Sequence, residues 1–356
     1  MNRRRKFQLV VNVIVSVIFG LCLSGAASAE SASNPVKIVI HDPGMSRGYT
    51  HSWEWWAKEV EKQTNGEVTF EILWGGPLGG YAESLDNVKN GVYDMSMVPP
   101  TYMPAKLPLW TAFEVPFITR SMWAFAMTMW DMKDMPVLKK EYEQHNVKPL
   151  IPVFPASFEL MSEKKLTSLA DLKGLKVRAY GMFAEVLEHF GANCSSMAST
   201  EIYENMQRGV IDAAICGGWP DQFVLYGIYE AASYALLLRG FGYIVLPLSI
   251  NLDTWNKISP KNQEIMTKLA RKTMDKLVEL TRTEGEPYLA KIKEKGIVIT
   301  KLSDPERDQM AKYAKTIWEG WVEKQVKAGR PQARMVMDTI ITKVKEYEQK
   351  DPYKDW

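Results

Sequence analysis

The sequence predicts an α/β protein of two lobes, braced by long helices toward its C-terminal end. Strand-like and helix-like segments alternate between residues 36 and 98, and a second alternating unit runs between residues 175 and 216. Such alternation is typical of strand–helix–strand units with largely parallel sheets. Residues 259–295 and 304–348 are dominated by helix formers with many charges, which predicts the bracing helices.

The first thirty residues have the pattern of an export signal. Basic residues at positions 3–6 precede a mainly apolar run from Leu9 to Leu23, and Ala27-Ser28-Ala29 matches a cleavage site. The run falls short of the roughly 20 residues that a membrane-spanning helix needs. We therefore expect residues 1–29 to be a cleaved signal peptide and the mature protein to be soluble and exported. The general secretory route is favoured, and the twin-arginine route stays open.

The elements of the first unit follow in a regular order. We expect strands at residues 36–40, 68–74 and 94–98, and helices at residues 52–63 and 85–90. A glycine-rich loop, residues 75–80, follows the second strand and opens the second helix. Its backbone N–H groups can bind an anion there, although a plain tight connection explains the loop equally well.

An irregular, proline-rich stretch at residues 99–116 leads to a helix at residues 122–132. In the second unit we expect strands at residues 175–179, 193–197 and 211–216, and helices at residues 183–190 and 200–208. The apolar runs 147–154 and 243–252 are expected to be the strands that cross between the lobes.

These elements predict the limits of the domains. Lobe I is expected to comprise residues 30–153 plus about 247–295, and lobe II residues 154–246 plus part of 296–340. Residues 341–356 are expected to form a C-terminal tail.

Composition and motifs exclude several classes of function. Forty-four basic residues nearly balance 42 acidic ones, and part of the excess belongs to the signal, so no nucleic-acid or membrane-surface partner is indicated. None of the four histidines belongs to a cluster with metal-ligand spacing. The nucleophile elbow, the phosphate-binding loop and the dinucleotide-binding fingerprint are missing. We expect no enzymatic activity, no cofactor and no metal. An enzyme built on a similar two-lobe fold is the alternative.

Two cysteines remain after cleavage, Cys194 and Cys216. They lie in the second and third strands of the second unit, and the usual winding places the first strand between those two. A disulfide needs Cα atoms within about 7 Å, which an intervening strand prevents. We expect two free thiols.

Arg178 is the sharpest local feature, because it ends an apolar strand in the segment from Gly174 to Gly181. Arginine is costly to bury unless it is paired. The carboxyl ends of parallel strands are where α/β sheets bind ligands, and a guanidinium can bind a carboxylate with two hydrogen bonds. An ordinary ion pair with an Asp or Glu is the alternative.

Several segments carry a resemblance to a known family, in their order and spacing: residues 60–66, 78–80, 91–94, 115–117, 171–178 and 201–212. Over essentially the whole mature chain, the sequence resembles the extracytoplasmic solute receptors of tripartite ATP-independent periplasmic (TRAP) transporters. The resemblance implies a two-lobe periplasmic-binding-protein fold, type II-like, and a location in the periplasm.

The resemblance also implies a function and a partner. In that family the arginine at the position of Arg178 grips the carboxylate of a small organic acid, the lobes close around it, and the TRAP membrane permease subunits receive it. A monomer is expected and a dimer stays open. The alternative is a receptor that presents its bound solute to a membrane sensor kinase.

One departure from the family concerns a metal. The segment Ile211 to Ala214 is most similar to the 2-oxo acid and organic acid branch, in which a Glu-Trp pair follows and helps hold a cation. Here Ile215 and Cys216 stand at those positions, and neither suits a hard cation. The resemblance therefore places Cys216 beside the ligand, and we expect no metal there.

A second departure is Glu159, which stands about where many relatives carry a further arginine. A glutamate there would repel a dicarboxylate or receive an amine or hydroxyl of the ligand. A plain surface glutamate is the alternative.

Aromatic residues complete the expected site. Four of them fall in loops or at strand ends that are expected to face the cleft: Trp74, Tyr102, Phe158 and Trp219. Four others have helical spacing and are expected in the core: Trp55, Trp56, Trp123 and Trp130.

Overall fold

Two mixed β-sheets position all the other elements, and each sheet grows from one alternating unit of the sequence. The computed structural model describes residues 35–353, all but the first of which belong to one compact unit. The predicted signal peptide and its cleavage site lie outside the described residues.

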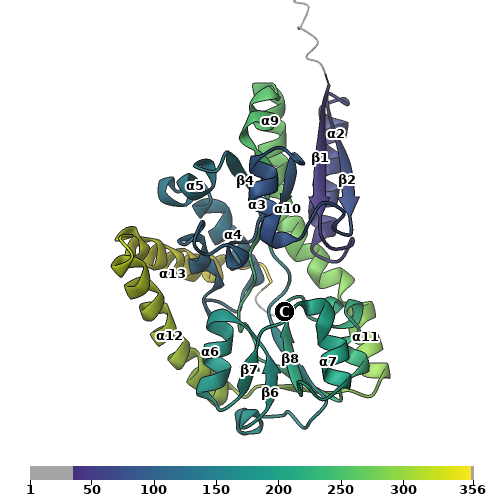
Figure 1. Ribbon diagram of the computed structural model, residues 1–356, viewed down its shortest axis with the longest axis vertical. Coiled ribbons are helices and arrows are strands. Elements are labelled where there is room, and N and C mark those ends of the chain that lie inside the picture. Colours follow the sequence, from purple (N-terminus) through teal and green to yellow (C-terminus); the bar gives the residue numbers. More distant parts are fainter. Residues whose placement is uncertain (1–34, 354–356) are drawn as a thin grey trace, which may run out of the picture. The chain divides into compact units, whose positions relative to one another are not determined.

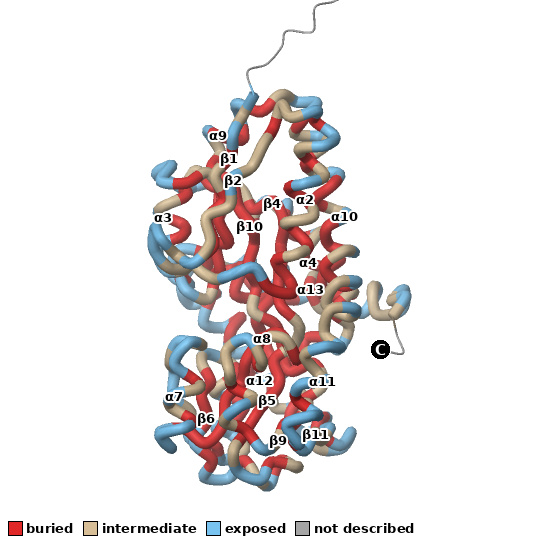
Figure 2. The backbone as a smooth tube through the Cα atoms, turned by 90° about the vertical axis from the view of Figure 1, so that its right-hand side faces the viewer, coloured by how far each residue is buried: buried red, intermediate tan, exposed pale blue. Residues whose placement is uncertain are grey.

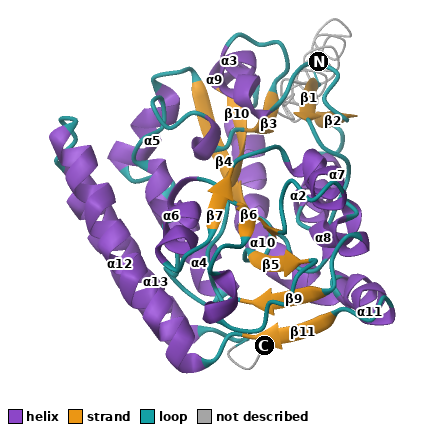
Figure 3. Ribbon diagram, turned by 60° about the horizontal axis from the view of Figure 1, so that its bottom comes forward, coloured by secondary structure: helices purple, strands orange, loops and turns teal. Residues whose placement is uncertain are grey.

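The first sheet has five strands in the order β2-β1-β3-β10-β4 (Figure 3), of which β1, β2 and β4 are labelled in Figure 1. Its strands are β1 (Val36–Asp42), β2 (Val68–Trp74), β3 (Met95–Met97), β4 (Val147–Val153) and β10 (Leu246–Asn251). Strand β1 pairs in parallel with β2 and β3, whereas β10 runs antiparallel to β3 and β4.

The second sheet has six strands in the order β11-β9-β5-β8-β6-β7. They are β5 (Glu159–Ser162), β6 (Lys176–Arg178), β7 (Asn193–Ser195), β8 (Ala213–Cys216), β9 (Tyr234–Leu237) and β11 (Val298–Lys301). Strand β6 pairs in parallel with β7 and β8. Strand β5 lies beside β9, which lies beside β11 (Figure 3).

The prediction of largely parallel sheets is wrong for one strand in each sheet. Strand β5 is antiparallel to β8 and β9, and β10 is antiparallel to both its neighbours. These are the strands with which the chain enters the second sheet, after β4, and returns to the first, after β9. Neither connection joins two strands that pair with each other, so the direction of β5 and β10 depends on how the chain passes between the sheets.

Twelve α-helices and several short 3-10 turns are assigned within residues 35–353. Those that accompany the sheets are α2 (Thr50–Gln63), α3 (Ser84–Lys89), α4 (Met122–Met132), α5 (Pro136–Glu143), α6 (Gly181–His189), α7 (Ile202–Gln207), α8 (Asp221–Leu225) and α9 (Leu252–Lys257). The last four are α10 (Pro260–Glu284), α11 (Glu286–Glu294), α12 (Asp304–Lys327) and α13 (Gln332–Lys350). Within this range no helix combines the length and apolar character that crossing a bilayer requires.

Capping residues mark the start of two of the long C-terminal helices. Ser259 caps α10 and Ser303 caps α12, and a proline follows in the first turn of each helix. Helix α10 packs on α2, α4 and β4 of the first sheet, and α11 packs on α8 beside the second. Helix α12 contacts α6 and α13, and α13 contacts α4. The predicted bracing of both sheets by these helices is therefore confirmed.

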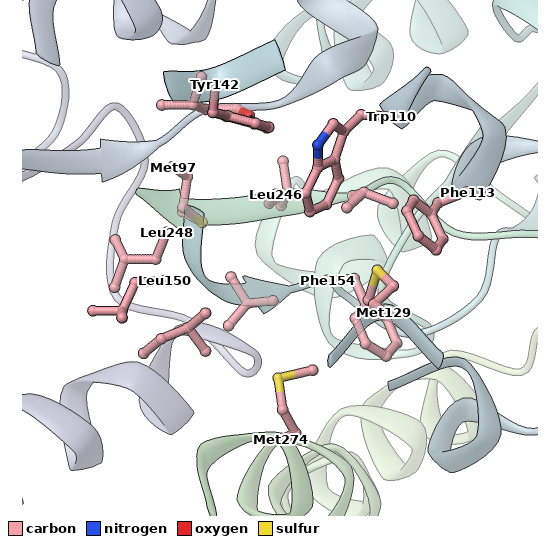
Figure 4. Close-up of a cluster of buried hydrophobic side chains, with 14 of the residues drawn as sticks. Met97, Trp110, Phe113, Met129, Tyr142, Leu150, Phe154, Leu246, Leu248 and Met274 are labelled. Atoms are coloured by element: carbon pink, nitrogen blue, oxygen red, sulfur yellow. The ribbon is translucent and has the colours of Figure 1, made fainter. Parts of the chain in front are cut away.

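Each sheet has its own hydrophobic core, seen as red tube in Figure 2. Trp110, Phe113, Phe154 and Tyr142 gather in the core of the first sheet (Figure 4). Trp56 is fully buried in this core, and Trp55, Trp123 and Trp130 pack against the core, as predicted. The limits of the two lobes stay a prediction, and Ile340 and Val344 of α13 belong to this first core.

Cys194 and Cys216 lie on β7 and β8, and β6 lies between these two strands. This is the arrangement that the usual winding predicts. Both cysteines are free, Cys216 buried and Cys194 half-buried.

Candidate functional site

Arg178 is the last residue of β6, and its side chain is 5% exposed. Its Nε donates to Met197 O at 3.0 Å, and Nη2 donates to the same oxygen at 2.9 Å and to Ser199 Oγ at 3.3 Å. Nη1 donates to Ile215 O at 3.1 Å. Backbone carbonyls therefore hold the guanidinium at its Nε–Nη2 edge and at Nη1. The second N–H of Nη1 remains available to donate a hydrogen bond.

Among residues 35–353, no carboxylate lies within ion-pairing distance of Arg178, so the ordinary ion pair that sequence reasoning left open is not formed there. The cation lies 4.9 Å from the centre of the Tyr180 ring instead. A buried guanidinium usually requires an anion, because transferring its charge from water is costly. The neighbourhood of β6 thus carries an uncompensated positive charge.

Two of the predicted site residues interact electrostatically with this charge. Tyr102 is 51% exposed, and its partial desolvation raises its pKa, whereas the positive charge of Arg178 opposes that rise. Burial raises the pKa of the Cys216 thiol to about 12, again against the pull of Arg178. Burial also raises the pKa of Tyr180, and the charge of Arg178 opposes this rise. Arg178, Tyr102 and Cys216 therefore lie in one electrostatic neighbourhood, together with Tyr180.

Sequence reasoning missed a second buried arginine, Arg47, which is 6% exposed. Its Nη2 donates to the hydroxyls of Tyr49 and Tyr81 at 2.6 and 2.7 Å, and Nε donates to Tyr49 at 3.0 Å. Asp42, the last residue of β1, lies 3.4 Å from Nη2. The signal was available, because Arg47 follows the carboxyl end of a parallel strand just as Arg178 ends one. Asp42, Arg47, Tyr49 and Tyr81 are called the Arg47 cluster below.

Tyrosines connect the Arg47 cluster with the surroundings of Arg178. The rings of Tyr81 and Tyr102 lie 5.7 Å apart. Burial raises the pKa of Tyr226, which also interacts electrostatically with Arg47, Cys216 and Tyr102. The candidate site therefore extends from the end of β6 to the end of β1, across both sheets.

Glu159 is buried, so its interpretation as a surface residue is wrong. Its Oε2 accepts a hydrogen bond from the backbone N–H of Leu238, and in the strand register it pairs with Cys216. Burial raises the pKa of Glu159 to about 8, against the backbone hydrogen bonds of Leu238 and Arg239. At neutral pH the side chain is therefore mostly uncharged, and repulsion of a dicarboxylate is not its effect.

This burial makes stability depend on pH. The folded pKa of about 8 lies above the ordinary value of 4.5, so the folded state binds the proton more tightly between those values. The free energy of unfolding should fall as pH rises through that window, by at most about 1.4 kcal/mol per pH unit from this group. Urea titrations at pH 5, 6.5 and 8 measure this fall. Between pH 5 and pH 8 the free energy of unfolding of Glu159→Gln should decrease less than that of wild type.

The exposed Glu185 supplies the control for this comparison. Glu185→Gln should give a stability profile parallel to that of the unchanged protein. If Glu159→Gln also runs parallel to wild type, Glu159 does not exchange its proton on unfolding in this range.

The other predicted aromatic residues lie elsewhere. Phe158 is 1% exposed in the core of the second sheet, where its ring contacts Tyr180 and Phe183. Trp74 ends β2 and stacks on Trp53 with 5.3 Å between ring centres. Trp219 precedes α8 and packs against Phe223. Phe158 thus contacts Tyr180, whose ring lies beside Arg178, whereas no contact with Arg178 is described for Trp74 or Trp219.

Trp219 lines a narrow crevice where segments of both sheets meet. Gly48, Tyr49, Pro155 and Asp221 also line it. A Cβ on Gly48 would lie 2.3 Å from Asp221 Oδ2, so the loop after β1 approaches the start of α8 closely. A side chain at position 48 would displace the Asp221 carboxylate. Within residues 35–353, no group of three or more His, Cys, Asp or Glu side chains is placed to hold a metal ion.

Comparison with known families gives a match over most of the chain. The family model described as "Bacterial extracellular solute-binding protein, family 7" matches residues 46–325. A solute-binding protein of Chromohalobacter salexigens is 23% identical over 313 residues, which cover 85% of this chain and 90% of that protein. A monocarboxylate 2-oxoacid-binding periplasmic protein of Nostoc is 30% identical over 59% of this chain and 58% of its own length.

Solved structures share the fold. A TRAP solute-binding protein from Rhodoferax ferrireducens in complex with copurified benzoate has a TM-score of 0.79 and 20% identity, covering 88% of this chain and 99% of that one. A second protein from Rhodoferax ferrireducens, with bound malonate, has a TM-score of 0.71 and 20% identity, covering 89% and 99%. The predicted α/β fold and the resemblance to TRAP receptors are confirmed.

Proposed function

From the premise that this chain belongs to family 7 of the bacterial extracellular solute-binding proteins, we propose that it binds one small organic acid through Arg178 and delivers it to a TRAP membrane permease. The family supplies the class of function, periplasmic solute binding for transport. The ligand class and the residues that hold it are inferred from the site.

The observation that carries the proposal is the buried charge of Arg178. No carboxylate among residues 35–353 pairs with it, while Met197 O and Ile215 O fix its orientation. A ligand carboxylate would supply the missing anion and accept the remaining N–H of Nη1. The Nε–Nη2 edge already donates to Met197 O, so binding at the Nη1 end replaces the two-bond grip expected from the sequence.

The tyrosines around Arg178 support an acid with a compact body. The Tyr180 ring lies 4.9 Å from the cation, Tyr102 interacts with it electrostatically, and Tyr226 interacts electrostatically with Tyr102. Tyrosine rings cover apolar surface while their hydroxyls remain available for hydrogen bonds. Benzoate, malonate and 2-oxo acids, which relatives are named for or contain, are of this size class.

The arrangement of the chain supports a role that ends in delivery rather than chemistry. The two sheets are joined by the segments after β4 and after β9, which we propose as the hinge between the two lobes predicted from the sequence. Closure around the acid would exclude water and strengthen the hydrogen bonds of Arg178. The closed form is what the permease subunits would recognise.

Comparison of acids with their primary amides tests the ligand class. Small molecules released from the purified protein are identified by mass spectrometry, and pyruvate, benzoate and malonate are titrated beside their amides by calorimetry. At least one acid should bind, and its amide should bind at least about 30-fold more weakly, because a buried charge pair contributes about 2 kcal/mol or more. Equal affinity for acid and amide would contradict the proposal.

A further inference from the structure

We propose that the Arg47 cluster forms a second polar contact of the same ligand site and binds a hydroxyl group that the acid carries away from its carboxylate. This inference rests on the proposed function, and it narrows the ligand class to hydroxy acids. The cluster lies at the carboxyl end of β1, where a parallel strand of the first sheet ends.

The main evidence is the unequal use of the two oxygens of Asp42, which is 1% exposed. Oδ1 accepts from Gly44 N at 2.7 Å and from the Tyr81 hydroxyl at 3.1 Å, and it lies 3.4 Å from Arg47 Nη2. Oδ2 is buried and has no hydrogen-bond partner among the described residues. A buried carboxylate oxygen without a donor is unfavourable, because nothing compensates for the loss of its hydration. A donor from a bound molecule would remove that cost.

The charges of the cluster determine which donor fits. Arg47 already compensates the charge of Asp42, so a ligand ammonium at Oδ2 would be repelled by the guanidinium. A second ligand carboxylate would be repelled by Asp42 and brings no proton to donate. A neutral hydroxyl donates to Oδ2 and can accept from Arg47 Nη1, which has an N–H beyond the one it gives to Met45 O.

The position of the cluster fits a ligand that also reaches Arg178. Tyr81 donates within the cluster, and its ring packs on Tyr102, whose pKa Arg178 affects. Tyr226 interacts electrostatically with Asp42 and Arg47 of the cluster and also with Cys216. A hydroxy acid placed along these tyrosines would join residues of both sheets, so its hydroxyl would contribute to closure.

Two series of probes test the inference in the unaltered protein. The first is propionate, 3-hydroxypropionate and β-alanine, and the second is benzoate, 3-hydroxybenzoate, 4-hydroxybenzoate and 4-(aminomethyl)benzoate. In at least one series a hydroxylated acid should bind about 10-fold or more tightly than its parent acid, and the ammonium-bearing acid should bind more weakly than the hydroxylated one. If every hydroxylated acid binds no better than its parent, the inference is overturned and the proposed function stands.

Variants assign the effect to the cluster. Asp42→Asn should remove most of the preference for the hydroxylated acid and change the affinity for the parent acid little, whereas Arg178→Ala should weaken both. If Asp42→Asn does not fold, a crystal structure of the complex decides: the ligand hydroxyl should lie within hydrogen-bonding distance of Asp42 Oδ2, and its placement elsewhere refutes the contact. Phenol and 1-propanol, which lack the carboxylate, should not bind. If phenol or 1-propanol binds as tightly as the corresponding hydroxylated acid, the result contradicts the proposed function instead.

Discussion

Replacement of Arg178 by alanine should weaken binding of the acid by about 30-fold to several thousand-fold. Truncating one partner of a buried, hydrogen-bonded charge pair costs about 2–5 kcal/mol, and the ligand carboxylate would remain in a site that excludes water. Isothermal titration with the acid identified by mass spectrometry measures the loss. Unchanged affinity would show that Arg178 does not contact the carboxylate.

Two further variants separate this effect from damage to the fold. Arg208, at the end of α7, is exposed and pairs with Glu204, so Arg208→Ala removes a positive charge from the same half of the chain and should leave affinity within about twofold. Arg178→Lys keeps the charge but cannot donate to Met197 O and Ile215 O together. It should recover only part of the affinity. Cooperative thermal unfolding of all three variants is the check on folding.

Gly240→Ala should lower the free energy of unfolding by about 2–5 kcal/mol, a loss made of two parts. Gly240 has φ +88°, a backbone conformation that costs an L residue about 1–2 kcal/mol. A Cβ there would lie 2.8 Å from Thr119 O and 3.0 Å from Arg120 Cα. Both are backbone atoms that cannot rotate away, so overpacking adds about 1–3 kcal/mol. Urea unfolding measures the sum.

Gly209 provides the matched control, because it has φ +65° and a Cβ added there would meet no atom within 4 Å. Gly209→Ala should cost only the conformational part, about 1–2 kcal/mol. The difference between the two variants measures the close approach at Gly240, in the segment that joins β9 to β10. Equal losses at both glycines would mean that the backbone around Thr119 relaxes freely.

The regular part of the fold could be predicted because its signals are local. Strand β2 and helix α4 have the bounds that their sequences predict, residues 68–74 and 122–132. Strands β5, β9 and β11 were missed, although β6 and β7 are shorter and were predicted; the three missed strands lie outside the two alternating units that revealed the other short strands. The antiparallel direction of β5 and β10 depends on how the chain passes between the sheets, which no local pattern encodes.

The candidate site likewise contains residues that could be predicted from the sequence and residues that could not. Arg178 was recognisable because it ends an apolar strand, and Arg47 could have been found by applying the same reasoning to the loop after β1. The proximity of Tyr81 to Tyr102, and of Tyr226 to Arg47 and Cys216, could not be predicted. These residues come from separate elements, and only the packing of the two sheets brings them together.

The backbone bonds of Arg178 bear on the entropy of binding. The three acceptors of its hydrogen bonds belong to the second sheet or to the turn beside it: Met197 O, Ser199 Oγ and Ile215 O. They therefore hold the side chain independently of the position of the first sheet. Immobilising a long side chain at an interface costs about 0.5–1.5 kcal/mol. For Arg178 folding has already met that cost, so an incoming carboxylate encounters a donor that is already oriented.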